Sequence, residues 1–213
     1  MDTPMGLRER KKDETRRLLA RVALDLFEER GFDNVSVAEI ADAAGVSKKT
    51  VFNYFEVKED LVLGSGKHHI EEPAAVVRQR PVGQTPHGAI RDYLLTALAE
   101  RQPMTGLSGR PHVLRIGRLV HTTPALAVRN MQYQDQSQHL LAKALVDEGA
   151  SDLSAQLIAA QIHSAQQVLL AENTRRVMAG EHPDDIYPDA VTATQHAFRW
   201  LERGLGDVLR REQ

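Results

Sequence analysis

Hydrophobic residues recur at helical spacing along most of the chain. In the first part, apolar pairs at positions 18/19, 22/23 and 26/27 return every four residues. This spacing predicts a first amphipathic helix over about residues 13–30, which Gly31 would end because glycine tolerates the left-handed backbone that often follows a helix. No segment shows the strict alternation of a half-buried strand. We therefore predict an all-α protein.

Two short helices are predicted next. Ser36-Val37-Ala38-Glu39 matches a capping box and predicts a helix over 36–44, and Ser47 caps a third helix over 47–55. Gly45 supplies the turn between them, and Ala41 is small enough for the two helices to cross closely. The positions that must be buried to hold such a pair are Ile40, Ala44, Val46, Val51 and Tyr54. The pattern favours a helix-turn-helix, although a packed helical corner remains an alternative.

The rest of the chain is also predicted to be helical. A fourth helix from about Val57 is interrupted by Gly64, Gly66 and Pro73, and residues 80–86 form a linker. Five more helices are predicted, at about 87–101, 111–121, 123–149, 151–180 and 188–211, which gives about nine in all. We place a domain boundary between residues 1–56, which contain the helix-turn-helix, and residues 57–213.

Charge is unevenly distributed over the 213 residues, whose formal net charge is −2. Residues 1–21 carry seven basic and four acidic side chains, and residues 43–55 carry Lys48, Lys49 and no acid. Two basic segments in an otherwise balanced chain are compatible with a nucleic-acid partner. Solvated surface charge is the alternative for the two lysines, and a disordered tail is the alternative for the basic arm at residues 8–12.

The composition excludes several kinds of chemistry. The chain has no cysteine, which rules out disulfides and Cys-ligated zinc and fits a reducing cytoplasm. Residues 1–12 do not look like a signal peptide, and no run of about 18 apolar residues predicts a membrane span. His68 and His69 are adjacent rather than at ligand spacing, and no nucleophile elbow or phosphate loop occurs. We therefore expect no enzyme activity, catalytic residue, metal or cofactor.

The first 65 residues contain a specific set of motifs: Leu26-Phe27-Glu28-Glu29-Arg30-Gly31-Phe32, Val37-Ala38-Glu39-Ile40-Ala41-Asp42-Ala43-Ala44-Gly45-Val46-Ser47, Thr50-Val51-Phe52-Asn53-Tyr54-Phe55 and Lys58-Glu59-Asp60-Leu61. As a set, these motifs resemble the TetR family of transcriptional regulators. The opening Gly6-Leu7-Arg8-Glu9-Arg10-Lys11-Lys12 and the junction Thr123-Pro124-Ala125-Leu126 are similar to an actinobacterial subgroup. The resemblance implies an N-terminal helix-turn-helix DNA-binding domain, and a C-terminal helical domain that binds a ligand and dimerises.

The helix-turn-helix geometry assigns candidate DNA contacts, because the N-terminal residues of a recognition helix meet base edges in the major groove. The candidate DNA-binding residues are Ser36, Ser47, Lys48, Lys49, Thr50, Phe52, Asn53, Tyr54 and Lys58. Asn53 suits adenine, a lysine suits guanine, and Phe52 suits a thymine methyl group. Ser36 and Lys58 stand at helix N-termini, which favour phosphate. The family often has tyrosine where this chain has Phe52. For Tyr54, a purely structural role in the core is the alternative to a DNA contact.

The C-terminal part supplies the remaining candidates. The resemblance implies that the last two helices form a four-helix bundle with a second copy, and the dimer-interface candidates are Phe198, Trp200, Leu201 and Leu205. The candidate ligand-binding residues are Arg115, Arg118, Met131, Tyr133, Gln161, His163 and Gln167. Arg115 and Arg118 suit an anionic effector. Ordinary solvent exposure is the alternative for these polar residues, and packing within one subunit is the alternative for the last helix.

Taken together, these features predict a ligand-responsive repressor. It would bind a palindromic double-stranded DNA operator as a homodimer, be released by a small-molecule effector, and have no membrane partner. The alternative function is a constitutive, architectural DNA-binding protein without a ligand.

Overall fold

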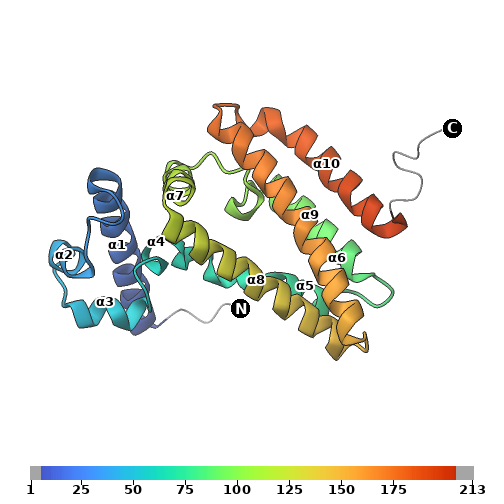
Figure 1. Ribbon diagram of the computed structural model, residues 1–213, viewed down its shortest axis with the longest axis horizontal. Helices are drawn as coiled ribbons and strands as arrows, with labels where there is room; N and C mark the ends of the chain where they lie inside the picture. Colours follow the sequence, from blue (N-terminus) through green and yellow to red (C-terminus); the bar gives the residue numbers. More distant parts are fainter. Residues whose placement is uncertain (1–5, 205–213) are drawn as a thin grey trace. The chain divides into compact units, whose positions relative to one another are not determined.

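The computed structural model describes residues 6 to 204, apart from the side chains at positions 7, 8, 65 and 68, and this range is helical throughout (Figure 1). The α-helices are α1 (Leu7–Arg30), α2 (Val37–Ala43), α3 (Lys48–Tyr54), α4 (Asp60–Leu63), α5 (Glu72–Gln79), α6 (Pro86–Ala99), α7 (Pro111–Thr122), α8 (Pro124–Asp147), α9 (Asp152–Met178) and α10 (Pro183–Arg203). Two 3-10 helices, η1 (Gly64–Ile70) and η2 (Pro103–Thr105), complete the described chain. The predicted all-α class is confirmed, with ten α-helices in this range rather than about nine.

The chain packs as two compact units. We call the first the head: it comprises the described residues through Lys67 together with Arg115–Met131. The second, the body, comprises His68–Leu114 and the described residues from Gln132 onward. The division differs from the boundary predicted after residue 56, because a segment from the middle of the sequence packs with the N-terminal helices. Hydrophobic spacing reports which face of a helix is buried, not which distant helix buries it.

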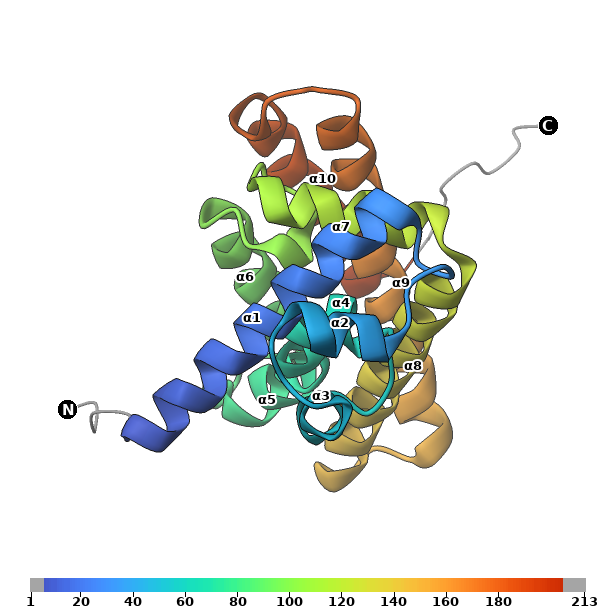
Figure 2. The same cartoon turned by 90° about the vertical axis from the view of Figure 1, so that its left-hand side faces the viewer.

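The head is built on α1, which contacts both α2 and α4. Its core is apolar and closely packed, with Leu19, Phe27 and Ile40 at 1% exposure or less. The first helix begins at Leu7, not near residue 13 as predicted, and Figure 2 shows its first turns extending beyond α2 and α3. The five residues after Leu7 are arginines, lysines and a glutamate, all good helix formers, so nothing in the sequence stops the helix there.

The predicted fourth helix is broken into three pieces. Only Asp60–Leu63 is α-helical, after which Gly64 begins the 3-10 segment η1. Pro73 then lies in the first turn of α5, where a missing backbone N–H costs little. The prediction of one interrupted helix was therefore wrong: Gly64 ends α4, Gly66 lies within η1, and Pro73 lies in the first turn of a new helix.

In the body, α10 packs against both α6 and α9, and α9 and α10 run side by side (Figure 1). One apolar cluster joins Ile90 and Leu94 of α6 to Ile162 of α9 and Phe198 of α10. The last helix begins at Pro183, five residues before the predicted start at Pro188. His182 caps it and Pro183 occupies the first turn, so Pro188 lies inside the helix, at a cost of one backbone hydrogen bond.

A buried loop fastens η2 to α9. Asn173, which is 6% exposed, donates a hydrogen bond of 2.9 Å to the carbonyl of Thr105. Gly106 has φ +73°, and a Cβ atom there would lie 2.5 Å from the carbonyl oxygen of Leu170. Only glycine satisfies both the left-handed backbone and this close approach.

Candidate nucleic-acid interface

The two short helices of the head begin with side-chain caps. Ser36 accepts a hydrogen bond from the Glu39 amide at 3.3 Å, and the Ser36 amide donates to the Glu39 carboxylate at 2.8 Å. Ser47 accepts from the Thr50 amide at 3.1 Å. The predicted capping box and the predicted cap at the start of α3 therefore form as the sequence indicated. The hydroxyls of these two serines are used inside the protein.

The capping box also sets the charge of Glu39. The Ser36 amide, with the Arg30 guanidinium at 2.6 Å and the Ser36 hydroxyl, lowers the pKa of Glu39 to about 2. The carboxylate is consequently ionised at any physiological pH, and its negative charge lies at the start of α2, where the helix dipole favours it.

Gly45 forms the turn between α2 and α3. Its φ is +69°, and a Cβ atom at this position would meet nothing within 4 Å, so conformation rather than space favours glycine. Ile40, Ala41 and Val51 are fully buried. Ala44, Val46 and Tyr54, also predicted to be buried, are only half-buried in the structure because α2 and α3 are each two turns long and cover little surface.

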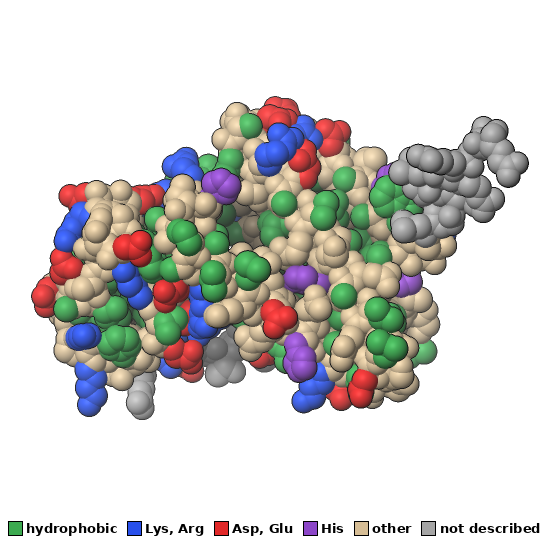
Figure 3. Space-filling view, in the orientation of Figure 1, with side chains coloured by type: hydrophobic (Ala, Val, Ile, Leu, Met, Phe, Trp, Pro, Cys, Tyr) green, Lys and Arg blue, Asp and Glu red, His purple; other side chains and the backbone are tan. Residues whose placement is uncertain are grey.

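The outer face of α3 carries basic and amide side chains. Lys48, Lys49 and Asn53 are exposed, and the two lysines form no ion pair with any described residue. Phe52 is 46% exposed, and its ring lies 6.0 Å from the Lys48 ammonium. Figure 3 shows basic and hydrophobic side chains next to each other over α3. A two-turn helix with this face presents hydrogen-bond donors, an amide and an apolar ring of the kinds that read base edges.

The other end of α3 is held by a residue that sequence analysis did not select. Arg16 of α1 donates a hydrogen bond of 3.0 Å to the carbonyl of Tyr54, and its guanidinium lies 5.3 Å from the centre of the Phe55 ring. The contact joins residues 38 positions apart, so no local motif could have indicated it. Thr50 and Tyr54 are both half-buried.

Lys58 lies in a different environment from the one predicted. Its ammonium donates to the carbonyl of Phe32 and stands 4.1 Å from the Phe32 ring centre and 5.3 Å from that of Phe27. Burial lowers the pKa of Lys58, and Asp33 and Glu59 oppose this. The side chain therefore binds the loop after α1, so the prediction that it meets phosphate is not supported by its position.

The basic arm belongs to a helix. Arg10, Lys11 and Lys12 are exposed side chains in the first turns of α1 rather than part of an extended tail. Nothing is described of the Arg8 side chain. A rigid helical arm can follow a phosphate backbone, but it is too wide to enter a minor groove as an extended segment would.

Two arginines from the middle of the sequence bind carboxylates of the head. Arg115 of α7 pairs with Asp25 at 2.5 Å and with Glu28, and these hydrogen bonds raise its pKa. Arg129 of α8 donates to Asp60 at 3.0 Å, and Asp60 is only 1% exposed.

Arg115 was predicted to bind an anionic effector. Its guanidinium is instead occupied by α1, which corrects that interpretation. Arg118 is exposed on α7, and Met131 is 66% exposed.

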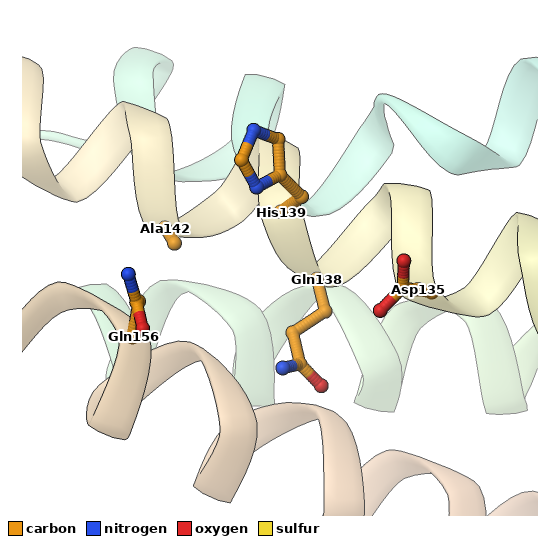
Figure 4. A pocket seen from close by; sticks show the side chains of 5 residues that line it. All are labelled: Asp135, Gln138, His139, Ala142 and Gln156. Carbon is orange, nitrogen blue, oxygen red and sulfur yellow. The ribbon is translucent and has the colours of Figure 1, made fainter.

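The remaining candidate ligand residues lie in the body. Tyr133 is buried, His163 and Gln167 are half-buried, and Gln161 is exposed. A hollow of about 250 Å³ lies between α8 and α9, lined by Asp135, Gln138, His139, Ala142 and Gln156. Figure 4 shows Gln138 and Asp135 of α8 pointing toward α9. Burial lowers the pKa of His163, and the negative charge of Asp135 opposes that shift.

The candidate dimer residues separate into different environments. Phe198 was predicted to lie in the dimer interface. It is only 1% exposed within the body's own core, so it cannot be an exposed anchor for a second copy. Leu201 packs on the same core, whereas Trp200 is 44% exposed, and its ring centre lies 4.3 Å from that of His196, with the two rings tilted by 48°. Leu205 lies outside the described residues. The α-helical period places residues 198 and 200 about 200° apart, which the near-heptad interpretation did not separate.

Among the described residues, no group of three histidine or carboxylate side chains could hold a metal ion, and none of the described helices has the length and apolarity needed to cross a bilayer.

Sequence comparison identifies the family of the N-terminal segment. Residues 19–64 match the profile of "Bacterial regulatory proteins, tetR family". The HTH-type transcriptional regulator TcmR of Streptomyces glaucescens is 31% identical over 150 residues, which is 70% of this chain and 66% of TcmR. Other curated relatives match over a third of their own length or less.

Solved structures share the fold. The Pseudomonas aeruginosa protein NalD, described as the secondary repressor of the MexAB-OprM multidrug efflux pump, has a TM-score of 0.54 at 19% identity, with 88% of this chain and 97% of NalD covered. Thermus thermophilus FadR, described as a TetR-family transcriptional repressor in complex with lauroyl-CoA, has a TM-score of 0.50 at 25% identity, with 93% and 97% covered.

Proposed function

Because this chain belongs to the TetR family of bacterial regulatory proteins, we propose that it is a transcriptional repressor. It binds a palindromic double-stranded DNA operator as a homodimer and is released by a small-molecule effector. One observation carries the proposal: α3 is fixed at both ends by hydrogen bonds, while on its outer face Lys48 and Lys49 have no ion pair, and the Asn53 amide has no hydrogen bond, within the described chain. Phosphate and base edges would supply the partners that the protein itself does not.

The exposed face of α3 suggests a role for each side chain. Lys48 and Lys49 would bind guanine edges or nearby phosphates, and Asn53 would pair with adenine. Phe52 would contact a thymine methyl group, since nearly half of its surface is exposed beside Lys48. Ser36, Ser47 and Thr50 would chiefly hold the helix ends at the correct approach, because their hydroxyls are used in caps.

The test begins with an operator selected from random double-stranded oligonucleotides by the purified protein. The triple variant Lys48→Ala/Lys49→Ala/Asn53→Ala should lose about 1–3 kcal/mol of binding free energy for each contact removed, with little change in melting temperature. Lys143→Ala is the matched control, because Lys143 is also exposed but lies in the body. Equal operator affinity for the triple variant and the wild type would refute the proposed interface.

The homodimer is proposed to form through α9 and α10. Leu153, Leu157 and Val168 of α9 are 54–69% exposed, and Trp200 of α10 is 44% exposed. Figure 3 shows hydrophobic side chains on the face of α9 toward the viewer. Large exposed apolar side chains on neighbouring helices are typical of an interface.

A charged double variant tests this interface. Leu157→Glu/Val168→Glu should give monomers in sedimentation velocity and lose binding to a full palindrome, because charge at a helix-bundle seam is costly to desolvate. Both positions are exposed, so the subunit fold should survive, whereas a charge at buried Phe198 would test folding instead. An intact dimer would place the interface elsewhere.

The effector is proposed to bind in the body. The hollow between α8 and α9, lined by polar side chains such as Gln138 and Gln156, supports this location, and the complex of T. thermophilus FadR with lauroyl-CoA suggests an acyl-CoA as the first probe. Lauroyl-CoA, a free fatty acid and a cationic dye should be compared by thermal shift and then by their effect on operator affinity. Gln138→Ala should weaken the response to the active probe, whereas His87→Ala should not, because His87 lies in α6 and does not line the hollow. An unchanged operator affinity with every probe would favour the constitutive alternative.

A further inference from the structure

Arg16 stands apart from the other basic residues of α1 because its side chain is bound to the end of the recognition helix. We propose that Arg16 is a positioning residue for DNA reading: it fixes the direction of α3 and does not itself bind DNA. The inference rests on the proposed function, since it concerns how the same helix is presented to the operator.

The length of α3 makes its end important. The helix has seven residues, and the last four carbonyls of any α-helix have no partner within it. The Phe55 amide satisfies Val51, and the Arg16 guanidinium satisfies Tyr54 at 3.0 Å. A positive charge at this end also complements the helix dipole. Arg16 is therefore the counterpart of Ser47, which caps the opposite end from within the helix's own sequence.

The Phe55 ring, which follows α3, gives the Arg16 guanidinium a second contact at the end of the helix. We call this pair of contacts the Arg16 brace. Phe55 is 4% exposed, and the Arg16 guanidinium lies over its ring at 5.3 Å. The ring also packs against Gly64, where an added Cβ atom would come within 3.3 Å of it. Phe55 is thus held by both α1 and the start of η1. Loss of Arg16 would leave the ring in place but release the end of the helix.

Two neighbouring residues provide the contrast. Both arginines are exposed on α1, but Arg17 forms no hydrogen bond or ion pair with any described residue, so it is available to a phosphate. Arg16 donates a hydrogen bond to the Tyr54 carbonyl, and its guanidinium carbon lies over the Phe55 ring. Adjacent arginines on one helix are therefore expected to act differently: one by contact with DNA and the other through α3.

The first experiment needs no DNA. Hydrogen exchange of the amides from Phe52 to Phe55 should become faster by about tenfold in Arg16→Ala, since a charge-assisted hydrogen bond to that helix end is lost. Arg17→Ala should leave these rates unchanged, and Arg16→Lys, which keeps one donor, should restore part of the protection. Unchanged hydrogen-exchange rates of these amides in Arg16→Ala would show that Arg16 does not hold the end of α3, whatever the protein binds.

The second experiment uses the selected operator and a scrambled duplex over a range of salt concentrations. Arg16→Ala should weaken operator binding about tenfold, leave binding to scrambled DNA nearly unchanged, and leave the salt slope unchanged. A direct phosphate contact would instead weaken both duplexes alike and reduce the salt slope by about one, as expected for Arg17→Ala. That result for Arg16 would overturn the inference. Failure of the wild type to discriminate the two duplexes would refute the proposed function and leave the exchange result standing.

Discussion

Basic side chains of α3 and of the body's helix ends have opposite surroundings. In the body, Arg176 pairs with Glu181 at 2.6 Å and with Asp189 at 2.8 Å, and Arg101 pairs with Asp184 at 2.7 Å over the Tyr187 ring. Lys48 and Lys49 in the head pair with no described carboxylate. Fixed pairs neutralise charge and connect elements, whereas unpaired lysines on a rigid helix keep their charge for a partner outside the chain.

This difference shows that the position of a basic residue in the sequence does not reveal whether its side chain is paired within the protein or available to an outside partner. Arg129 belongs to the head, yet it is paired like the arginines of the body: two of its guanidinium nitrogens donate to Asp60, an aspartate with 1% exposure. The head therefore contains both kinds of cation. Substitutions should separate them, because a bound cation affects unfolding and an unpaired one affects DNA.

The largest effect is expected at Arg129. Arg129→Met should lower the free energy of unfolding by about 3–5 kcal/mol, because it leaves buried Asp60 with less compensation. Lys67, whose ammonium lies 3.0 Å from Asp60, limits the loss. Denaturant unfolding measures it, and the double variant Asp60→Asn/Arg129→Met should recover part of the stability. A loss below about 1 kcal/mol in the single variant would mean that Asp60 is compensated without Arg129.

Two glycines extend the comparison to the backbone. Gly106 of the body and Gly45 of the head both have positive φ, but only Gly106 faces a backbone oxygen at 2.5 Å from an added Cβ atom. Gly106→Ala should cost about 3 kcal/mol or more, from strain and overlap together, and Gly45→Ala only about 1–2 kcal/mol. Thermal unfolding of the two variants tests the order. A larger loss of stability in Gly45→Ala than in Gly106→Ala would show that the α9 backbone near Leu170 moves easily to make room for the added Cβ atom.

A matched pair of charge removals should give a smaller effect. Arg176→Met is expected to lower the free energy of unfolding by less than Arg129→Met does, because the carboxylate partners of Arg176 are partly exposed and screened by water. Lys48→Met should change stability by less than about 0.5 kcal/mol but weaken operator binding. The free energy of unfolding and the operator affinity should be measured for both variants. Equal stability losses would remove the distinction between bound and unpaired cations.

The smallest expected effect is the dependence of stability on pH that comes from Glu39. The pKa of Glu39 falls from 4.5 to about 2 in the folded protein, so its contribution to stability is full above pH 4.5 and disappears as the pH falls to about 2. The stability difference between the wild type and Glu39→Gln should therefore shrink across that window. A carboxylate titration by NMR should place the Glu39 midpoint near 2, and a midpoint near 4.5 would show that the capping box is open in solution.

Local chemistry was predictable from the sequence, and long-range pairing was not. Ser36 and Ser47 cap helices that their own neighbours define, so four residues of sequence suffice to recognise each cap. Arg115 was predicted to face an anionic effector because it lies three residues from Arg118 on one face of a short helix, but its partners Asp25 and Glu28 lie about 90 residues away in the sequence. Phe198 and Trp200 show the same limit, since hydrophobicity alone does not say whether a side chain packs within its own subunit.

The segment Arg115–Met131 has a practical consequence for protein engineering. It packs with the head although about fifty residues of the body precede it in the sequence, and it contributes Arg115 and Arg129 to carboxylates of the head. A chimera that joins residues 1–67 to the effector domain of a relative would separate Asp25, Glu28 and Asp60 from these arginines. Exchange of specificity between relatives therefore requires a transplant in two pieces, with the arginine-bearing segment travelling alongside the DNA-reading helices.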